Sequence, residues 1–315
     1  MESIILVSIV LYLLSSVSYL AYLFVQKDYL QRTGFFLLLI GFLFHTLTIV
    51  YGFIKAGHIP VSNMHETLSF AGWAMAGVFL AIQLKFNLKI LGIFAAPILA
   101  LMMLVASWLP NEPAQTTQIF KSFWLISHVT VIFIGEAGFA LACGLGMLYL
   151  LQENEIKTKK HRFFFKRLPS LDLLDITGYA CIVVGFSLLT LGLATGLVYA
   201  KSYWGRFWSW DPKEVWSAIT WIFYAILLHE RLTVGWRGRR SAIMAIIGFG
   251  VLLFTFLGVA GLYVLLSADF IAVAQIMVYI GGILILLVFG VMLTRNATDV
   301  EIRAGTMNTL PALAV

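Results

Sequence analysis

Apolar stretches of about twenty residues recur along the whole chain, and they decide what it can fold into. No water is available inside a bilayer to satisfy backbone polar groups, so a stretch of this length crosses the bilayer as an α-helix. With 61% hydrophobic and only 11% charged residues among 315, the chain is predicted to be an all-α, polytopic transmembrane helical bundle. We expect about nine spans, at roughly 3–25, 34–55, 67–84, 90–108, 122–151, 174–200, 214–231, 242–266 and 271–294.

Lysine and arginine are distributed unevenly among the links between these spans. Most of the 21 basic residues lie in alternate links, at 26–32, 85–89, 152–170 and 231–240, and in the tail after 294. Cytoplasmic loops carry an excess of Lys and Arg, so we expect the N-terminus outside and the C-terminus in the cytoplasm. The first span has no basic segment before it and is predicted to be a retained helix rather than a cleaved signal. The net charge of +6 therefore reflects inner loops and does not indicate nucleic-acid binding.

The segment 201–216 is unusually rich in aromatic residues for a link between two spans. A connecting loop has no core of its own to fill, so this aromatic area suits a flat, apolar ligand. Lys201, Arg206 and Lys213 could meet carboxylates at the edge of such a ligand, and haem has both features. An interfacial belt is the alternative, because Trp and Tyr are enriched at membrane–water boundaries generally. The aromatic residues are Tyr203, Trp204, Phe207, Trp208, Trp210 and Trp216.

The pattern Trp204-Gly205-x-x-Trp208-x-Trp210-Asp211-Pro212 resembles the tryptophan-rich signature of the haem-handling proteins of cytochrome c maturation. Its continuation through His229-Glu230-Arg231 is most similar to the CcsA (ResC) branch, and the similarity covers roughly residues 35–258. The segment Gly57-His58-x-Pro60-x-Ser62-Asn63, followed by Glu66, is also similar to that family. Ser62 or Asn63 could equally serve as a helix cap there, with Glu66 in the first turn.

The resemblance implies a function, a cofactor and partners. Proteins of this family handle haem b in the bacterial inner (cytoplasmic) membrane, deliver it outward and present it for covalent attachment to the C-x-x-C-H motif of apocytochrome c. They act with a CcsB (ResB)-type partner that carries a large external domain, as a possible component of a haem lyase. We therefore expect a multi-pass membrane domain at 1–258, with its haem-presenting loop at 201–216 on the extracytoplasmic side.

The same resemblance implies roles for individual residues. His128 would be an external axial ligand of haem iron, and His229 would serve an inner haem site. The rings of Trp204, Trp208 and Trp210 would pack on the porphyrin, Arg206 and Lys201 would neutralise propionates, and Asp211 would orient the loop through backbone N–H groups.

The residues alone leave alternatives open for the histidines. His128 lies about two turns inside its span, where it could be a ligand or a satisfied buried imidazole. His229 could be an ordinary interfacial residue, and His58 and His65 could be solvated loop residues. His45 lies in mid-span, where an ionisable side chain is either functional or hydrogen-bonded within the bundle.

The end of the chain departs from the family pattern. No histidine follows His229, although the family has a second external ligand there; water, His58 or His65 could substitute. Residues 259–315 form an atypical end, and the pattern Gln275-x-x-Val-Tyr279-x-Gly281 resembles subunit J of NADH:quinone oxidoreductase. Two other functions therefore stay open: a haem exporter or sensor without ligation activity, and a membrane subunit of a quinone oxidoreductase.

Overall fold

The structure is a computed structural model and describes residues 2–110, 121–159 and 167–265. Within these residues the chain forms eight α-helices joined by short links. They are α1 (Glu2–Val25), α2 (Asp28–Ala56), α3 (Met64–Phe86), α4 (Leu91–Trp108), α5 (Phe123–Thr158), α6 (Leu171–Trp204), α7 (Pro212–Thr233) and α8 (Arg239–Leu265).

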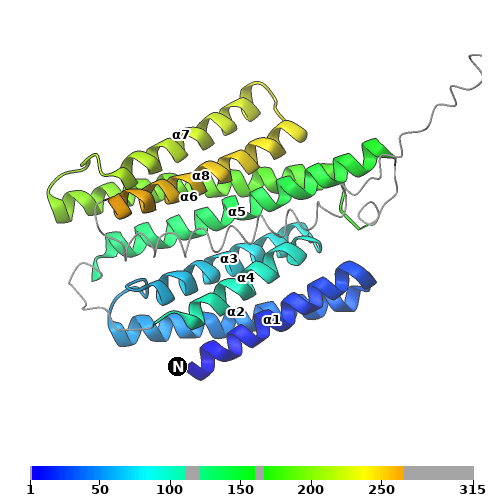
Figure 1. Cartoon of the computed structure of the whole chain (residues 1–315), viewed down its shortest axis with the longest axis horizontal. Coiled ribbons are helices and arrows are strands. Elements are labelled where there is room, and N and C mark those ends of the chain that lie inside the picture. The colour runs from blue at the N-terminus through cyan, green and yellow to red at the C-terminus, as the bar shows by residue number, and fades with distance from the viewer. Residues whose placement is uncertain (1, 111–120, 160–166, 266–315) are drawn as a thin grey trace, which may run out of the picture.

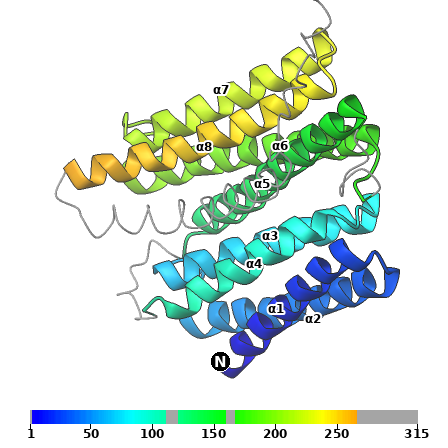
Figure 2. The same ribbon diagram turned by 45° about the vertical axis from the view of Figure 1, so that its right-hand side comes forward.

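The helices lie side by side with their axes roughly aligned, in layers of two (Figure 1). The order is α1 with α2, then α3 with α4, then α5 with α6, and finally α7 with α8, as the turned view also shows (Figure 2). The most extensive packing between any two of these helices is between α5 and α6, which form the third layer. Helix α3 packs against α5 on one side of this layer, and α8 packs against α5 on the other.

The first eight predicted spans are all helices in the structure. Six of these, α1 to α6, are long and apolar enough to cross a membrane, so the chain is a multi-pass helical membrane protein. The ninth predicted span, 271–294, lies outside the described residues. The links at 57–63 and 205–211 lie at the same end of the bundle (Figure 1), in agreement with the predicted alternation of the spans. Which end faces the outside stays a prediction.

Local sequence signals explain where several helices begin and end. Asn63 caps α3, because its side-chain oxygen accepts a hydrogen bond from the Glu66 backbone N–H at 2.8 Å. The Glu66 carboxylate in turn accepts bonds from the backbone and hydroxyl of Ser62, which is a reciprocal capping arrangement. The predicted cap is therefore confirmed. Gly57 ends α2 in the left-handed conformation, at φ 68°, which glycine adopts without steric cost.

Glycines bring the central pair of helices together. A Cβ atom on Gly135 of α5 would lie 3.1 Å from the Gly185 carbonyl oxygen of α6, and one on Gly192 of α6 would lie 2.5 Å from Ile132 of α5. Small residues let helix backbones approach closely inside a membrane, where van der Waals packing drives association. This close contact fixes the position of the α5 residues relative to the end of α6 that carries the aromatic segment.

Candidate functional site

The aromatic segment 201–216 is only partly a loop. Residues 201–204 form the last turn of α6, which runs four residues beyond the predicted span and ends at Gly205 in the left-handed conformation, at φ 74°. Helix α7 begins at Pro212, whose missing N–H costs nothing in the first turn. Asp211 caps α7 by accepting a 3.0 Å hydrogen bond from the Lys213 backbone N–H. The true loop is therefore 205–211.

Glu214 ties this loop back to α7. Its two carboxylate oxygens accept hydrogen bonds from the Ser209 backbone N–H at 2.7 Å and from the Ser209 hydroxyl at 2.8 Å. Hydrogen bonds to a charged acceptor are stronger than neutral ones, so this pair fixes the middle of the loop. At the start of the loop, Lys201 Nζ donates to the Gly205 carbonyl oxygen at 2.9 Å.

A cavity of about 380 Å³ lies between the loop and the ends of α5, α6 and α7 nearest to it. This volume falls within the range of small-molecule and cofactor sites. Its wall is mostly apolar, with a histidine, a lysine and a glutamate among the polar contributors. The lining includes Leu125, His128, Leu193, Gly196, Leu197, Tyr199, Trp204, Phe207, Trp208, Lys213 and Glu214.

His128 presents one ring nitrogen to a backbone acceptor. Its Nδ1 lies 2.6 Å from the carbonyl oxygen of Gly192 on α6. A carbonyl can only accept, so Nδ1 carries the proton and Nε2 carries the lone pair. Among the described residues, Nε2 has no hydrogen-bond partner. A ring held in this tautomer by a bond through its other nitrogen is the arrangement that metal-ligating histidines use.

Gly196 leaves the space in which the His128 ring sits. A Cβ atom at position 196 would lie 2.7 Å from Nδ1 and 2.8 Å from Cε1 of that ring. Any other residue at 196 would displace the imidazole from the Gly192 carbonyl. Gly192 and Gly196 together therefore place His128 against α6.

The aromatic side chains around the cavity remain substantially exposed. Trp204 is 51% exposed, Phe207 55% and Trp208 38%, although all three line the cavity. The Lys213 ammonium lies 5.3 Å from the centre of the Trp204 ring. A site with unburied aromatic faces, a cation and an imidazole nitrogen lone pair can bind a flat apolar ligand that has both anionic groups and a metal centre.

Four predicted residues of the segment, namely Lys201, Arg206, Trp210 and Asp211, do not line this cavity. Trp210 is 78% exposed, contacts Trp208 edge-to-face and has φ 58°, a left-handed conformation that is strained for a bulky residue. Arg206 is exposed and Asp211 acts as the α7 cap. Among the described residues, the cation beside the cavity is Lys213; Lys201 lies over the Phe207 ring at 5.4 Å.

The remaining predicted histidines lie elsewhere. His45 is fully buried, and its two ring nitrogens contact Tyr12 Oη at 3.2 Å and Ser69 Oγ at 2.9 Å. His229 is exposed, near the opposite end of α7 from the loop. His58 is buried in the 57–63 link, with Nδ1 2.8 Å from the Ile59 carbonyl oxygen. His65 Nδ1 lies 2.7 Å from the carbonyl oxygen of Ala106.

Gly192, Gly196 and Glu214 were missed by the sequence reasoning. The two glycines could have been found from the sequence, because the spacing Gly192-x-x-x-Gly196 is typical of a close helix–helix contact within a membrane span. The sequence gives little indication that Glu214 has a special role, since an acidic residue in the first turn of a helix is common. Its bond to Ser209 depends on the path of the loop.

Comparison with known proteins identifies the family. Residues 61–266 match the family described as "Cytochrome C assembly protein". This match covers the 57–63 link only at its end but includes His128, the aromatic segment and His229. The chain belongs to the cytochrome c assembly protein family.

Relatives in this family are called "Cytochrome c biogenesis protein CcsA". The protein from Mesostigma viride is 34% identical over 261 residues, which cover 75% of this chain and 86% of the relative. The protein from Chlamydomonas reinhardtii is 40% identical over 214 residues, covering 65% of this chain and 59% of the relative. A Prochlorococcus marinus relative is 35% identical over 251 residues, covering 71% and 79%. The resemblance to the CcsA branch is therefore confirmed.

The end of the chain has a second match. Residues 239–315 match the family "NADH-ubiquinone/plastoquinone oxidoreductase chain 6", in agreement with the resemblance of this region to subunit J. The two matches overlap on α8, which is one continuous helix in the structure. This chain therefore matches two families, and α8 belongs to both matched ranges.

Proposed function

We propose that this chain is a membrane component of cytochrome c biogenesis that binds haem in the cavity beside His128 and presents it there for attachment to apocytochrome c. One observation carries the proposal. The Nδ1–H of His128 is bonded to the Gly192 carbonyl oxygen, which leaves Nε2 unprotonated at the wall of a cavity surrounded by exposed aromatic rings.

The residues of the cavity fit haem as a cargo. Haem iron needs few protein ligands, because the porphyrin supplies four nitrogens, and one imidazole is an adequate axial ligand. Trp204, Phe207 and Trp208 would bury the apolar macrocycle, and Lys213 would neutralise a propionate. Haem brings the vinyl groups to which cysteine thiols add, whereas this chain supplies binding and orientation.

The other residues of the segment take supporting parts in this proposal. The exposed Trp210 and Arg206 would contact the bound haem edge or the incoming apocytochrome, and Lys201 would add positive charge nearby. Asp211 and Glu214 would hold the loop in place through the bonds described above. A CcsB-type partner would supply the external domain, and the cavity would open on the extracytoplasmic side of a bacterial inner membrane.

His229 belongs to the proposal as a separate inner ligand. It lies on α7, near the end of the helix that the distribution of Lys and Arg places toward the cytoplasm. Haem would enter through this inner site and leave at His128. His45 has both ring nitrogens engaged with Tyr12 and Ser69, so it would have to break those bonds to bind haem.

Two alternatives each have one observation in their favour. A haem exporter or sensor without ligation activity is favoured by the lack of any histidine after His229. A membrane subunit of a quinone oxidoreductase is favoured by the match of residues 239–315.

The test is the reduced visible spectrum of the full chain purified in mild detergent. We expect co-purified b-type haem, and we expect His128→Ala to lower the haem content by about tenfold or more, because a ligand and its orienting bond are lost together. His229→Ala should lower it separately. His161→Ala, in the basic inner link, is the matched control and should leave the haem content unchanged.

The outcomes separate the candidates. The proposal is contradicted if the haem content is unchanged in both His128→Ala and His229→Ala, or if the wild-type chain carries no haem. Co-purification of a haem-free chain with a respiratory complex would favour the oxidoreductase subunit. Co-expression with apocytochrome c and a CcsB-type partner then distinguishes ligation from export. Attached haem supports presentation, whereas bound but unattached haem supports the exporter or sensor.

A further inference from the structure

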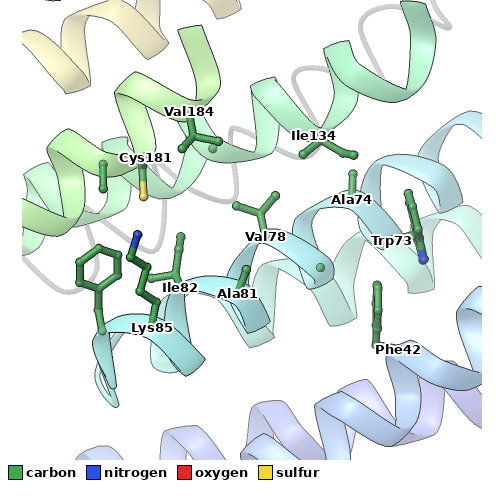
Figure 3. A pocket seen from close by; sticks show the side chains of 14 residues that line it. Phe42, Trp73, Ala74, Val78, Ala81, Ile82, Lys85, Ile134, Cys181 and Val184 are labelled. Carbon is green, nitrogen blue, oxygen red and sulfur yellow. The ribbon is translucent and has the colours of Figure 1, made fainter. Parts of the chain in front are cut away.

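A second cavity, of about 340 Å³, lies between α3 on one side and α5 and α6 on the other (Figure 3). It shares no lining residue with the cavity beside His128. Its walls are built from helices that are long and apolar enough to cross a membrane, so its surroundings are the hydrocarbon interior. The proposed haem function makes no use of it.

The cavity is elongated along α3. On this helix its lining runs from Trp73 to Phe86, which is about 20 Å at 1.5 Å per residue. Apart from the Lys85 ammonium, the lining is mostly apolar, so an extended hydrocarbon chain matches this channel in length and in surface.

Small side chains create this channel. Ala74, Gly77 and Ala81 recur along one face of α3, and Gly138 of α5 and Ala180 of α6 face them. At one end of the channel the rings of Phe42 and Trp73 are stacked, with centroids 5.9 Å apart. The Trp73 indole N–H is already bonded to Thr46 Oγ1 at 2.9 Å, so these rings present apolar surface to the channel.

The other end of the channel carries a positive charge. Lys85 reaches from α3 toward α6, where Cys181 lies across the channel (Figure 3). Within the described part of the chain, Lys85 forms no salt bridge, whereas the neighbouring Lys89 is paired with Asp28 at 2.8 Å. Lys85 lies in the last turn of α3, beside a link that carries Lys89, so the charge lies at the predicted cytoplasmic surface.

We propose that this channel binds one acyl chain of an anionic phospholipid from the cytoplasmic leaflet, with the lipid phosphate beside Lys85. The apolar walls match the chain. The Lys85 ammonium lies over the Phe86 ring at 5.5 Å and has no carboxylate partner in the described part of the chain, so it matches the head group. The helix axes and the acyl chains of a bilayer both run across the membrane, so the lipid enters without turning. The bound lipid fills the space between the α3 and α5–α6 layers.

The test uses the full chain in lipid nanodiscs that contain equal amounts of phosphatidylglycerol and phosphatidylcholine, followed by native mass spectrometry of the released protein. We expect one retained lipid per chain, with phosphatidylglycerol favoured about fivefold, since a basic residue near the surface contributes about this much to anionic lipid binding. Lys85→Gln should abolish the preference. Lys89→Gln removes a basic residue from the same link without touching the channel, and should preserve it.

A second variant tests the channel itself. A Cβ atom on Gly77 would meet Phe42 at 3.4 Å, an ordinary contact, so Gly77→Leu should fold and fill the channel. We expect it to retain neither lipid while its haem content stays unchanged. Absence of retained lipid in the wild-type chain, equal retention of the two lipids, or an equal effect of Lys85→Gln and Lys89→Gln would each overturn the proposal. If Gly77→Leu does not fold, the Lys85→Gln comparison still decides the matter.

Discussion

The two ends of α7 are held by different kinds of contact. Its first turn is joined to the exposed aromatic loop by hydrogen bonds from Ser209 and by the Asp211 cap. Its last turn carries Arg231, whose guanidinium makes two parallel bonds to the Asp175 carboxylate of α6, at 2.9 and 2.7 Å. These two side chains are only 8% and 11% exposed.

The Arg231 end of α7 is buried by its partners, whereas the loop end keeps aromatic rings exposed. Asp175 also accepts a bond from the Gly238 backbone N–H, and Arg231 donates to Ser241 Oγ and lies over the Tyr179 ring, so α6, α7 and α8 are joined at one point. At the loop end, Trp204, Phe207 and Trp210 are each more than half exposed. The difference teaches that burial within the chain accounts for the Arg231 end, whereas it does not account for the concentration of aromatic rings at the loop end.

The largest expected effect comes from breaking the contacts at the Arg231 end. Asp175→Asn would leave the buried Arg231 guanidinium without its countercharge, and we expect a loss of about 3 kcal/mol in the free energy of unfolding. Thermal unfolding in detergent measures it. Asp28→Asn is the matched control, because its salt bridge with Lys89 is exposed, and its effect should be much smaller. Equal effects of the two substitutions would refute the contrast between a buried and an exposed pair.

An intermediate effect is expected from Gly196→Ala, at the end of the bundle that carries the aromatic loop. The added Cβ would meet the His128 ring at 2.7 Å, and we expect a destabilisation of about 1–3 kcal/mol together with a loss of haem. Gly250→Ala in α8 is the control, because nothing lies within 4 Å of its Cβ and alanine favours helix. Unfolding midpoints and haem content measure both. Unchanged haem in Gly196→Ala would show that the position of the ring does not matter.

The smallest effect concerns the strained loop. Trp210 has φ 58°, which glycine adopts freely and alanine does not. Trp210→Gly should therefore be more stable than Trp210→Ala by about 1 kcal/mol, while both lose the same aromatic surface. Chemical denaturation of the two variants gives this difference. A more stable alanine variant would mean that the left-handed conformation is not kept in solution.

Much of the fold follows from local sequence signals. The length of each apolar run predicted the first eight helices, and Ser62 or Asn63 was the expected cap of the third, which the structure assigns to Asn63. The end of α6 was predicted four residues too early, because the polar residues Lys201 and Ser202 indicate the end of an apolar span. In the structure these residues continue the helix, and Gly205 ends it.

The long-range contacts could not be predicted in this way. His128 was recognised from its place in a span, but its partner is a backbone carbonyl 64 residues away, and every residue has such a carbonyl. Asp175 lies close to the start of a span and forms its clamp with a residue 56 positions later. The channel beside Lys85 depends on which faces of three helices meet, and small residues in one helix do not specify that choice.

The clamp at Arg231 also sets the direction of α7. Arg231 and Lys213 are about 27 Å apart along the helix axis. Between them, the Trp221 indole N–H donates to Thr190 Oγ1 of α6 at 2.9 Å, and the Tyr224 ring stacks on Phe139 of α5. The clamp and these contacts hold α7 along α5 and α6, so Lys213 and Glu214 are placed at the wall of the cavity by contacts made far along the helix from them.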